Sequence, residues 1–423
     1  MDLQTLAVHH GYEKDNQKTM AVPIYQSSAF EFKSADHAAE TFGLQHGYNN
    51  VYSRIGNPTN DILEQRYTAL ESGTGALATA SGMSAILYSI LNVADSGDNI
   101  ISAEKLYGGT VTLFTHTLKR LGIEVRYFDQ SKPEQIEPLI DEKTKAVFFE
   151  SVTNPSIDLP DYDAITAVAK KHGIVSIIDN TVATAVLCRP IEHGVDVVIH
   201  SCSKYTTGQG LTIGGIIIEG ASCGELLKGN ERYPHFNTPD ETYGGIVYAE
   251  ALTAIAFTFR ARMVLLRDTG AALTPFSAWL LIQGLETLPI RVREHAANAL
   301  ALAKYLEAHP KVTKVYYPGL KGDTNNELAQ KYMPEGAGGL LSFEVAGFEA
   351  AKTILDETKL FSIVVNIGDT KSIITHPAST THVQLAEDEL EAAGVPSGLI
   401  RISAGIEKAK DLIDDLSQAL DKI

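Results

Sequence analysis

Short apolar runs alternate with helical patterns between about residue 74 and residue 220 of the chain. Apolar runs of about five residues bounded by turn-forming residues indicate buried strands, and longer stretches with apolar residues three or four positions apart indicate helices. This alternation predicts an α/β fold, with a mostly parallel sheet and helices on both of its faces. The seven predicted strands are ALATA (76–80), NIISA (99–103), EVRYF (124–128), AVFFE (146–150), IVSII (174–178), VDVVI (195–199) and TIGGIIIE (212–219).

The pattern changes on both sides of this segment. Residues 1–60 are rich in Tyr, Asn, Gly and Pro and have weak periodicity, which predicts an N-terminal arm without a core of its own. An amphipathic pattern over residues 277–308 predicts a long helix that breaks near Pro289. The later runs KVTKVYYPG, GGLLSFEVAG and GLIRISAG predict further strands. We therefore expect a large domain at 61–269 and a smaller α+β domain at 270–423.

Charge and length narrow the class of protein. The 423 residues exceed what one ordinary core accommodates. There are 35 Lys and Arg residues against 52 Asp and Glu residues, a net charge of −17 without a basic block, which argues against nucleic acid or membrane partners. The first residues lack the basic and apolar regions of a secretory signal, and no segment offers 18 uncharged apolar residues. A cytoplasmic protein is expected.

Neither the cysteines nor the histidines suggest a metal site. Cys188, Cys202 and Cys223 have no paired spacing and are predicted to be small buried apolar residues. The 13 histidines include no H-E-x-x-H motif and no zinc-like cluster. No metal is expected.

Candidate chemistry lies after the strands, because ligands of parallel sheets bind outside the carboxyl ends of the strands. Lys204 lies in HSCSKYTTGQGLTIGG (200–215), a few residues after a predicted buried strand. A lysine that is desolvated in such a place has a lowered pKa and can form a Schiff base. Taken alone, a lysine in such a place is more often a solvated surface residue.

Two other residues have suitable chemistry for the same edge of the sheet. Asp179 directly follows the run IVSII, so its carboxylate needs a partner such as the protonated nitrogen of a pyridine ring. Alternatively, Asp179 caps the next helix. Tyr107 follows NIISA and is suited to stack on a ring, or else it is an ordinary core residue.

A phosphate group has a candidate binding loop in SGMS (81–84). Small residues between a strand and a helix expose backbone N–H groups at the helix N-terminus, where the helix dipole also favours an anion. The hydroxyl groups of Ser201 and Ser203 flank Lys204 and are expected to reach the same phosphate. The alternative is a plain strand-to-helix turn.

The order of these motifs along the chain, SG, LYG, TNP, D and then SxSK, each after a strand, resembles the Cys/Met-metabolism pyridoxal phosphate enzymes. This family includes cystathionine synthases and lyases, methionine gamma-lyase and O-acetylhomoserine sulfhydrylase. The resemblance extends from TLAVHHG near the N-terminus to RISAGIE near the C-terminus. It implies the fold of a fold-type I PLP-dependent transferase with pyridoxal 5'-phosphate as cofactor.

The resemblance also implies roles for matching residues. Lys204 would hold the cofactor as a Schiff base and move protons, with Tyr107 stacking on the ring and assisting catalysis. Arg401 of RISAG would bind the substrate carboxylate. The other implied cofactor-binding residues are Asp179, Thr181, Gly82, Met83, Ser201, Ser203 and, from a neighbouring subunit's arm, Tyr52 and Arg54. The other implied substrate-binding residues are Asn154 and Asn366.

Two features separate members of the family. Methionine gamma-lyase is similar to this chain in NIGDTKSIITHPASTTH (366–382) but carries a cysteine where this chain has Gly109. The segment YPHFNTPDETYGGIVY (233–248) resembles an insertion of O-acetylhomoserine sulfhydrylases. We expect γ-replacement in methionine biosynthesis, in which O-acetylhomoserine and sulfide or a thiol give homocysteine and acetate. Methionine gamma-lyase and cystathionine γ-synthase or lyase are the alternatives, and a homotetramer of dimers with shared sites is expected.

Two other classes of function fit the sequence less well than a pyridoxal phosphate enzyme. The spacing of Ser201 and Lys204 matches the S-x-x-K motif of serine beta-lactamases, but their K-T-G and S-D-N motifs are absent from the sequence. A non-enzymatic scaffold with this fold would be expected to lack Lys204, Asp179 or Arg401, and all three are present.

Overall fold

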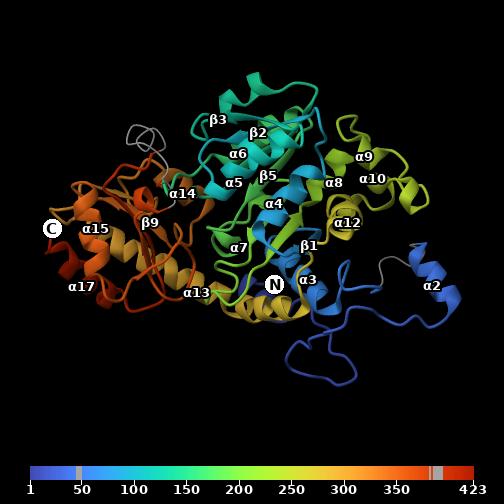
Figure 1. The fold of residues 1–423 in the computed structure, drawn as a ribbon, viewed down its shortest axis with the longest axis horizontal. Helices are drawn as coiled ribbons and strands as arrows, with labels where there is room; N and C mark the ends of the chain where they lie inside the picture. The colour runs from blue at the N-terminus through green and yellow to red at the C-terminus, as the bar shows by residue number, and fades with distance from the viewer. Residues whose placement is uncertain (44–49, 381–382, 384–393) are drawn as a thin grey trace.

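The large sheet is the centre of the computed structural model, which describes residues 1–43, 50–380, 383 and 394–423 (Figure 1). Its strand order is β1-β7-β6-β5-β4-β2-β3, and only β7 runs antiparallel to its neighbours. The strands are β1 (Gly75–Thr79), β2 (Asn99–Ala103), β3 (Glu124–Phe128), β4 (Thr144–Glu150), β5 (Val175–Asp179), β6 (Val197–Ser201) and β7 (Gly215–Glu219). The predicted seven-stranded, mostly parallel sheet is confirmed.

The strand boundaries differ from the predicted ones by up to three residues. The strands at 99–103 and 124–128 are confirmed without a shift. β6 ends two residues later than predicted, because Ser201 still pairs with Gly215 of β7 and the N–H of Cys202 donates to the carbonyl oxygen of Gly214 at 2.9 Å. Ser201 therefore belongs to the rigid end of a strand and not to a loop.

Helices cover both faces of the sheet, as the burial of its inner strands shows. Every residue of β2 and of β4 is buried, so both faces of these strands are shielded from water. Helix α4 (Gly82–Leu91) packs on β6 and β7, and α6 (Tyr162–Lys171) packs on β5. The other helices up to residue 269 are α1 (Leu3–His9), α2 (Ala35–Phe42), α3 (Pro58–Leu70), α5 (Gly108–Thr112), α7 (Thr184–Leu187), α8 (Ala221–Leu227), α9 (Pro234–Asn237), α10 (Tyr248–Ala251), α11 (Ala256–Arg260) and α12 (Arg267–Thr269).

A second sheet is formed by the C-terminal part of the chain, with strand order β10-β11-β12-β9-β8. Its strands are β8 (Lys314–Tyr316), β9 (Leu340–Glu344), β10 (Ser362–Ile363), β11 (Ile373–Thr375) and β12 (Leu399–Ser403), and its helices are α14 (Asn326–Tyr332), α15 (Phe348–Glu357) and α17 (Ala409–Leu420). The three strands predicted here are confirmed, whereas β10 and β11 were not predicted. The domain boundaries at residues 60 and 269 stay a prediction.

The predicted break near Pro289 is wrong, because α13 (Pro275–Glu307) is one continuous helix of 33 residues. Proline removes one helical hydrogen bond, which favours a break when nothing else holds the helix. Here α13 packs on α1 and α3 and also on α17, β8 and β9, so tertiary contacts hold both halves in line. The buried Arg291 adds hydrogen bonds beside the proline, to the carbonyl oxygens of Gly284 (2.7 Å) and Tyr205 (2.8 Å).

The N-terminal arm is packed at one end and exposed at the other. Helix α1 packs on α13 and α3. Figure 1 shows α2 and the connecting segments, in dark blue, projecting away from the rest of the molecule. Large apolar side chains in this part are exposed, with Met20 at 84% and Phe42 at 68%. Residues 44–49 of the predicted arm, and residues 381 and 382 at the end of the 366–382 motif, lie outside the described residues.

The structure also shows the state of the cysteines, the character of the helices and the grouping of possible metal ligands. Cys188, Cys202 and Cys223 are buried and carry free thiols, which confirms their interpretation as small buried residues. Every helix within the described ranges is too short or too polar to cross a lipid bilayer. The described residues also contain no group of acidic, histidine and cysteine side chains arranged to hold a metal ion.

We predict that Arg291→Leu lowers the free energy of unfolding by about 2–4 kcal/mol, because buried carbonyl oxygens lose their donors. The affected acceptors belong to Tyr205, Thr206 and Gly284. Urea unfolding at fixed protein concentration is the measurement. Arg293→Leu on the same helix is the control, since its 39% exposed side chain forms a surface ion pair with Glu335 and an exposed hydrogen bond to Gln4. Equal losses in the two variants would contradict the role of Arg291.

Candidate active site

The carboxyl ends of β4, β5 and β6 bring three polar residues to one edge of the large sheet. Glu150 ends β4, Asp179 ends β5 and Ser201 ends β6. Glu150 and Asp179 are direct partners in the β4 and β5 register. Because the strands are parallel, the segments that follow them also meet at this edge. The edge predicted from the sequence is thus the place where the polar side chains converge.

Lys204 lies in the turn that follows β6, and its amine reaches the C-terminal part of the chain. Its Nζ donates a hydrogen bond to Oδ1 of Asn366 at 2.7 Å. Burial, and then the positive charge of Arg401, lower the pKa of Lys204. More of its amine is therefore neutral and nucleophilic near neutral pH than in a solvated lysine. The surface-lysine alternative does not fit this partly buried position.

Asp179 is held by the residue two positions further along the chain. Its Oδ1 accepts hydrogen bonds from the backbone N–H of Thr181 at 3.0 Å and from the Thr181 hydroxyl group. Burial raises the pKa of Asp179, whereas Thr181 and the nearby His200 oppose this shift. Helix α7 is capped by Ala183, so Asp179 is not the helix cap considered as an alternative. A cationic ring nitrogen would stabilise the charged form of this carboxyl group.

The loop at residues 81–83 lies directly against the ends of β6 and β7. Ser81 caps α4 by accepting a hydrogen bond from the N–H of Ser84 at 3.1 Å. A Cβ on Gly82 would approach the Cβ of Ser201 to 2.7 Å, and one on Gly215 would approach the carbonyl oxygen of Ser81 to 2.1 Å. Only glycine fits these two positions. The free N–H groups of the first turn of α4 and the Ser201 side chain thus lie side by side, as an anion site requires.

Ser203 has a more local set of contacts than Ser201. Its Oγ accepts from the N–H of Gly214 at 3.1 Å and donates to the carbonyl oxygen of the same residue at 3.3 Å. These bonds hold the turn before β7 against the turn that carries Lys204. Met83 is half-buried in the first turn of α4.

Arg401 is the buried cation of the site. It lies on β12 and is only 5% exposed. Its guanidinium donates to Oδ1 of Asn154 at 2.9 Å and to the carbonyl oxygen of Asn366 at 3.0 Å, and its Nε is buried without a partner among the described residues. Burial lowers the pKa of Arg401 to about 10. Hydrogen bonds therefore connect Lys204, Asn366, Arg401 and Asn154, four residues singled out in the sequence.

Tyr107 is not a core residue, because its side chain is 49% exposed. It lies directly before α5, and its backbone N–H donates to Oε1 of Glu150 at 2.6 Å. Glu150 was missed in the sequence. The sequence did contain a signal for Glu150, because it ends the run AVFFE just as Asp179 follows IVSII. A charged residue at the end of a buried strand needs a polar partner.

Tyr52 and Arg54 lie apart from these residues. Tyr52 is 41% exposed, and the guanidinium carbon of Arg54 lies 5.0 Å from the centre of the Tyr52 ring. Within the described part of the chain, no hydrogen bond joins either residue to Lys204, Asp179 or Arg401. A single chain therefore does not bring this pair into the polar cluster.

The segment at 233–248 lies at the opposite edge of the sheet from Lys204. The hydroxyl group of Tyr233 accepts from the N–H of Val175 at 2.8 Å and donates to the carbonyl oxygen of Lys145 at 2.7 Å. Val175 begins β5 and Lys145 is the second residue of β4. Tyr233, at the start of the segment, therefore lies at the amino ends of β4 and β5, away from Lys204.

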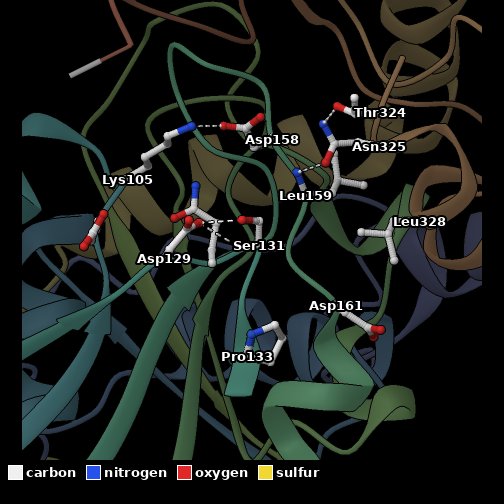
Figure 2. Close-up of a pocket in the computed structure, with 12 residues that line it drawn as sticks. Lys105, Asp129, Ser131, Pro133, Asp158, Leu159, Asp161, Thr324, Asn325 and Leu328 are labelled. Atoms are coloured by element: carbon white, nitrogen blue, oxygen red, sulfur yellow. Dashed lines mark hydrogen bonds and ion pairs between the residues drawn. The ribbon is translucent and has the colours of Figure 1, made fainter. Parts of the chain in front are cut away.

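A polar cavity of about 450 Å³ borders the site (Figure 2). It lies between the segments that follow β2, β3 and β4 and the residues at the start of α14. Lys105 and Asp158 form an ion pair across it at 2.6 Å, and Asn325 accepts from the N–H of Leu159 at 3.2 Å. The lining residues do not include Lys204, Asp179 or Arg401. The cavity is therefore a neighbour of the candidate site and not the site itself.

Comparison with known proteins decides the family. Residues 4–421 match the model of the family described as Cys/Met metabolism PLP-dependent enzyme. The chain belongs to this family. It is 44% identical to an O-acetyl-L-homoserine sulfhydrylase of Leptospira meyeri, over 99% of this chain and 97% of that protein. It is also 44% identical to a homocysteine synthase of Schizosaccharomyces pombe, over 99% of this chain and 98% of that protein.

A solved structure agrees with this assignment. A crystal structure from Campylobacter jejuni is described as a proposed O-acetylhomoserine (thiol)-lyase, and it carries a pyridoxyl-lysine monophosphate. It superposes on this chain with a TM-score of 0.96 at 48% sequence identity, and the match covers all of both chains. The fold-type I architecture and the cofactor pyridoxal 5'-phosphate follow for this member of the family. The residues present fit the cofactor, since the glycine-lined loop beside Ser201 accommodates a phosphate and Asp179 offers a carboxylate to a ring nitrogen. Membership of the family excludes the beta-lactamase and scaffold alternatives.

The lowered pKa of Lys204 leads to a testable pH dependence. In the apoprotein, we expect acetic anhydride to modify Lys204 at lower pH than it modifies exposed lysines, because the neutral amine reacts. Arg401→Met removes the positive charge that lowers the pKa, so the pH profile of Lys204 should move to higher pH. Arg401→Lys keeps a charge and should move the profile less. Peptide mass mapping across the pH range measures it, and an unchanged profile in Arg401→Met would contradict the charge effect.

Proposed function

We propose that the chain catalyses a γ-replacement in methionine biosynthesis, in which O-acetylhomoserine and sulfide, or a thiol, give homocysteine and acetate. The observation that carries the proposal is the hydrogen-bonded cluster in which the amine of Lys204 and the guanidinium of Arg401 share Asn366. It places a nucleophilic amine beside a carboxylate-binding cation, as an amino-acid substrate requires. The names of the curated relatives, O-acetylhomoserine sulfhydrylase and homocysteine synthase, support the choice of reaction.

The proposed roles follow from the positions of the side chains. Lys204 holds the cofactor covalently, and Asp179 pairs with its ring nitrogen while Thr181 orients the carboxylate. Tyr107 covers one face of the ring. The loop at Gly82 and Met83, together with Ser201 and Ser203, binds the phosphate. Arg401 binds the α-carboxylate of the substrate through its unpaired Nε, with Asn154 and Asn366 holding the guanidinium in place.

The reaction needs two proton transfers, for which Lys204 is the proposed base. The bound cofactor supplies an electron sink for the pair of electrons that the Cα–H bond releases. The amine of Lys204, once the amine of the substrate has taken its place, would remove the proton from Cα, and a second proton would leave Cβ as the Cγ–O bond breaks and acetate departs. Sulfide then forms the new bond to Cγ, and the protons return to Cβ and Cα. The hydroxyl group of Tyr107 is a candidate to assist these transfers.

The surroundings of Gly109 favour the sulfhydrylase over methionine gamma-lyase. A Cβ on Gly109 would lie 2.6 Å from Cε1 of the Tyr107 ring. A cysteine at this position is incompatible with Tyr107 as it is placed, so the ring would have to move. The segment at 233–248 supports the same choice only as a family marker, because it lies far from Lys204 along the strands.

We also propose a homotetramer of dimers whose subunits share active sites. The exposed pair Tyr52 and Arg54 supports this arrangement, because Arg54 has no acidic partner among the described residues and is thus available to bind a neighbour's phosphate. The exposed apolar side chains of the arm support it too, since a second subunit would bury them. A cytoplasmic location stays a prediction.

The reaction is tested by offering purified protein O-acetylhomoserine, O-succinylhomoserine, cystathionine and methionine side by side, with sulfide present. We expect homocysteine and acetate from O-acetylhomoserine at a kcat/KM at least about tenfold above that for the other three. Acetate release and thiol formation are the two measurements. A higher kcat/KM with methionine or cystathionine would replace the sulfhydrylase by the lyase alternative.

Shared sites are tested by mixing two inactive variants. Lys204→Ala lacks the amine, and Arg54→Ala lacks the proposed phosphate contact, so a hybrid dimer retains one intact site. We expect activity to reappear once the subunits have exchanged. Mixing Lys204→Ala with Asp179→Ala is the control, because both residues belong to the same chain's cluster, so each site of that hybrid lacks one of them and no activity should reappear. Recovery absent from the first mixture, with exchange verified by mass, would mean that each site comes from one chain.

A further inference from the structure

Glu150 is a buried acid at the site that has no part in the proposed chemistry. It is the last residue of β4 and is 5% exposed. Its partner in the register of the sheet is Asp179, the residue proposed to pair with the cofactor. A buried carboxyl group is costly unless its oxygens have partners, so its retention at this position calls for a reason.

The hydrogen bond of Glu150 goes to the main chain of Tyr107. Its Oε1 accepts from the backbone N–H of Tyr107 at 2.6 Å, across 43 residues of sequence. The carbonyl oxygen of Tyr107 accepts from the N–H groups of Thr110 and Val111 in the first turn of α5, and Leu106 before it is buried. The Tyr107 ring, in contrast, is 49% exposed, and a Cβ on Gly108 would meet no atom within 4 Å. The carboxyl group of Glu150 thus fixes the backbone N–H of Tyr107 at a point where its own side chain is not packed.

The surroundings of Glu150 favour the protonated form of its carboxyl group. Burial, and then the neighbouring Asp179, raise the pKa of Glu150 well above that of a solvated carboxyl group. Asp179 has the two donors of Thr181 and the nearby His200 to stabilise its charge, whereas the single bond from Tyr107 is all that opposes the shift at Glu150. Two adjacent buried carboxyl groups do not both ionise readily, and Asp179 has more donors to stabilise a charge than Glu150 has.

We propose that Glu150 is a positioning residue whose carboxyl oxygen anchors the backbone of Tyr107 and thereby holds its ring at the cofactor site. The proposal rests on the role of Tyr107 given above. It requires an acceptor oxygen at position 150 but no negative charge there. Glutamine has such an oxygen at the same reach, and leucine has a similar volume without one.

The test compares Glu150→Gln with Glu150→Leu. In the apoprotein, we expect the amide protons of the peptide at 104–110 to exchange at least about tenfold faster in Glu150→Leu than in the parent, and within about threefold of the parent in Glu150→Gln. In the holoenzyme, Glu150→Leu should raise the dissociation constant for pyridoxal phosphate and lower kcat/KM about tenfold or more, whereas Glu150→Gln should stay within about threefold. Amide exchange does not depend on the substrate, so it tests the anchor even if the reaction assignment fails.

A double-variant cycle separates positioning from general stability. In a Tyr107→Ala background, Glu150→Leu should cause no further loss of cofactor affinity, because the ring it positions is gone. If Glu150→Leu does not fold, Glu150→Met takes its place. The proposal is overturned if Glu150→Gln is as impaired as the apolar variant, which would show that the charge matters, or if exchange at 104–110 is unchanged without the acceptor.

Discussion

The site depends on one constraint, which is that buried polar groups from two separate sheets must satisfy each other. Arg401 on β12 donates to Asn154, which follows β4, and Lys204 after β6 donates to Asn366, which precedes β11. A buried guanidinium left without acceptors would be strongly unfavourable. These bonds therefore fix the C-terminal sheet against the carboxyl edge of the large sheet. The cluster that chemistry requires is also the contact that holds the two parts in place.

Long-range supports keep the reactive turn rigid around that contact. Helix α13 holds the turn that carries Lys204, because its Arg291 donates to the carbonyl oxygens of Tyr205 and Thr206. Close approaches at Gly82 and Gly215 press the phosphate loop against the ends of β6 and β7. Such supports limit the movement of a side chain whose function needs a defined position. Stability and function therefore use the same contacts in this part of the molecule.

The charges at the edge are distributed so that each has a different environment. Lys204 is deprotonated more easily than a solvated lysine because of burial and Arg401. Asp179 has donors from Thr181, whereas Glu150 faces Asp179 and a single backbone N–H. Neighbouring titratable groups with opposed environments separate into charged and neutral partners. One buried edge thereby brings together a lysine of lowered pKa and two acids that are held by different donors.

The sequence by itself determined the large sheet, the family resemblance and most of the site residues. Continuous apolar runs predicted all seven strands, because strands buried on both faces need apolar residues throughout, and the polar residues after them indicated Lys204, Asp179 and Tyr107. Tertiary structure alone decided the continuity of α13 through Pro289, the short strands β10 and β11, the edge at which residues 233–248 lie, and the contact between Glu150 and Tyr107. Local patterns record which residues are buried but not which distant residues they meet. The bond between Arg401 and Asn154 spans 247 residues, and only the packing of the two sheets brings such partners together.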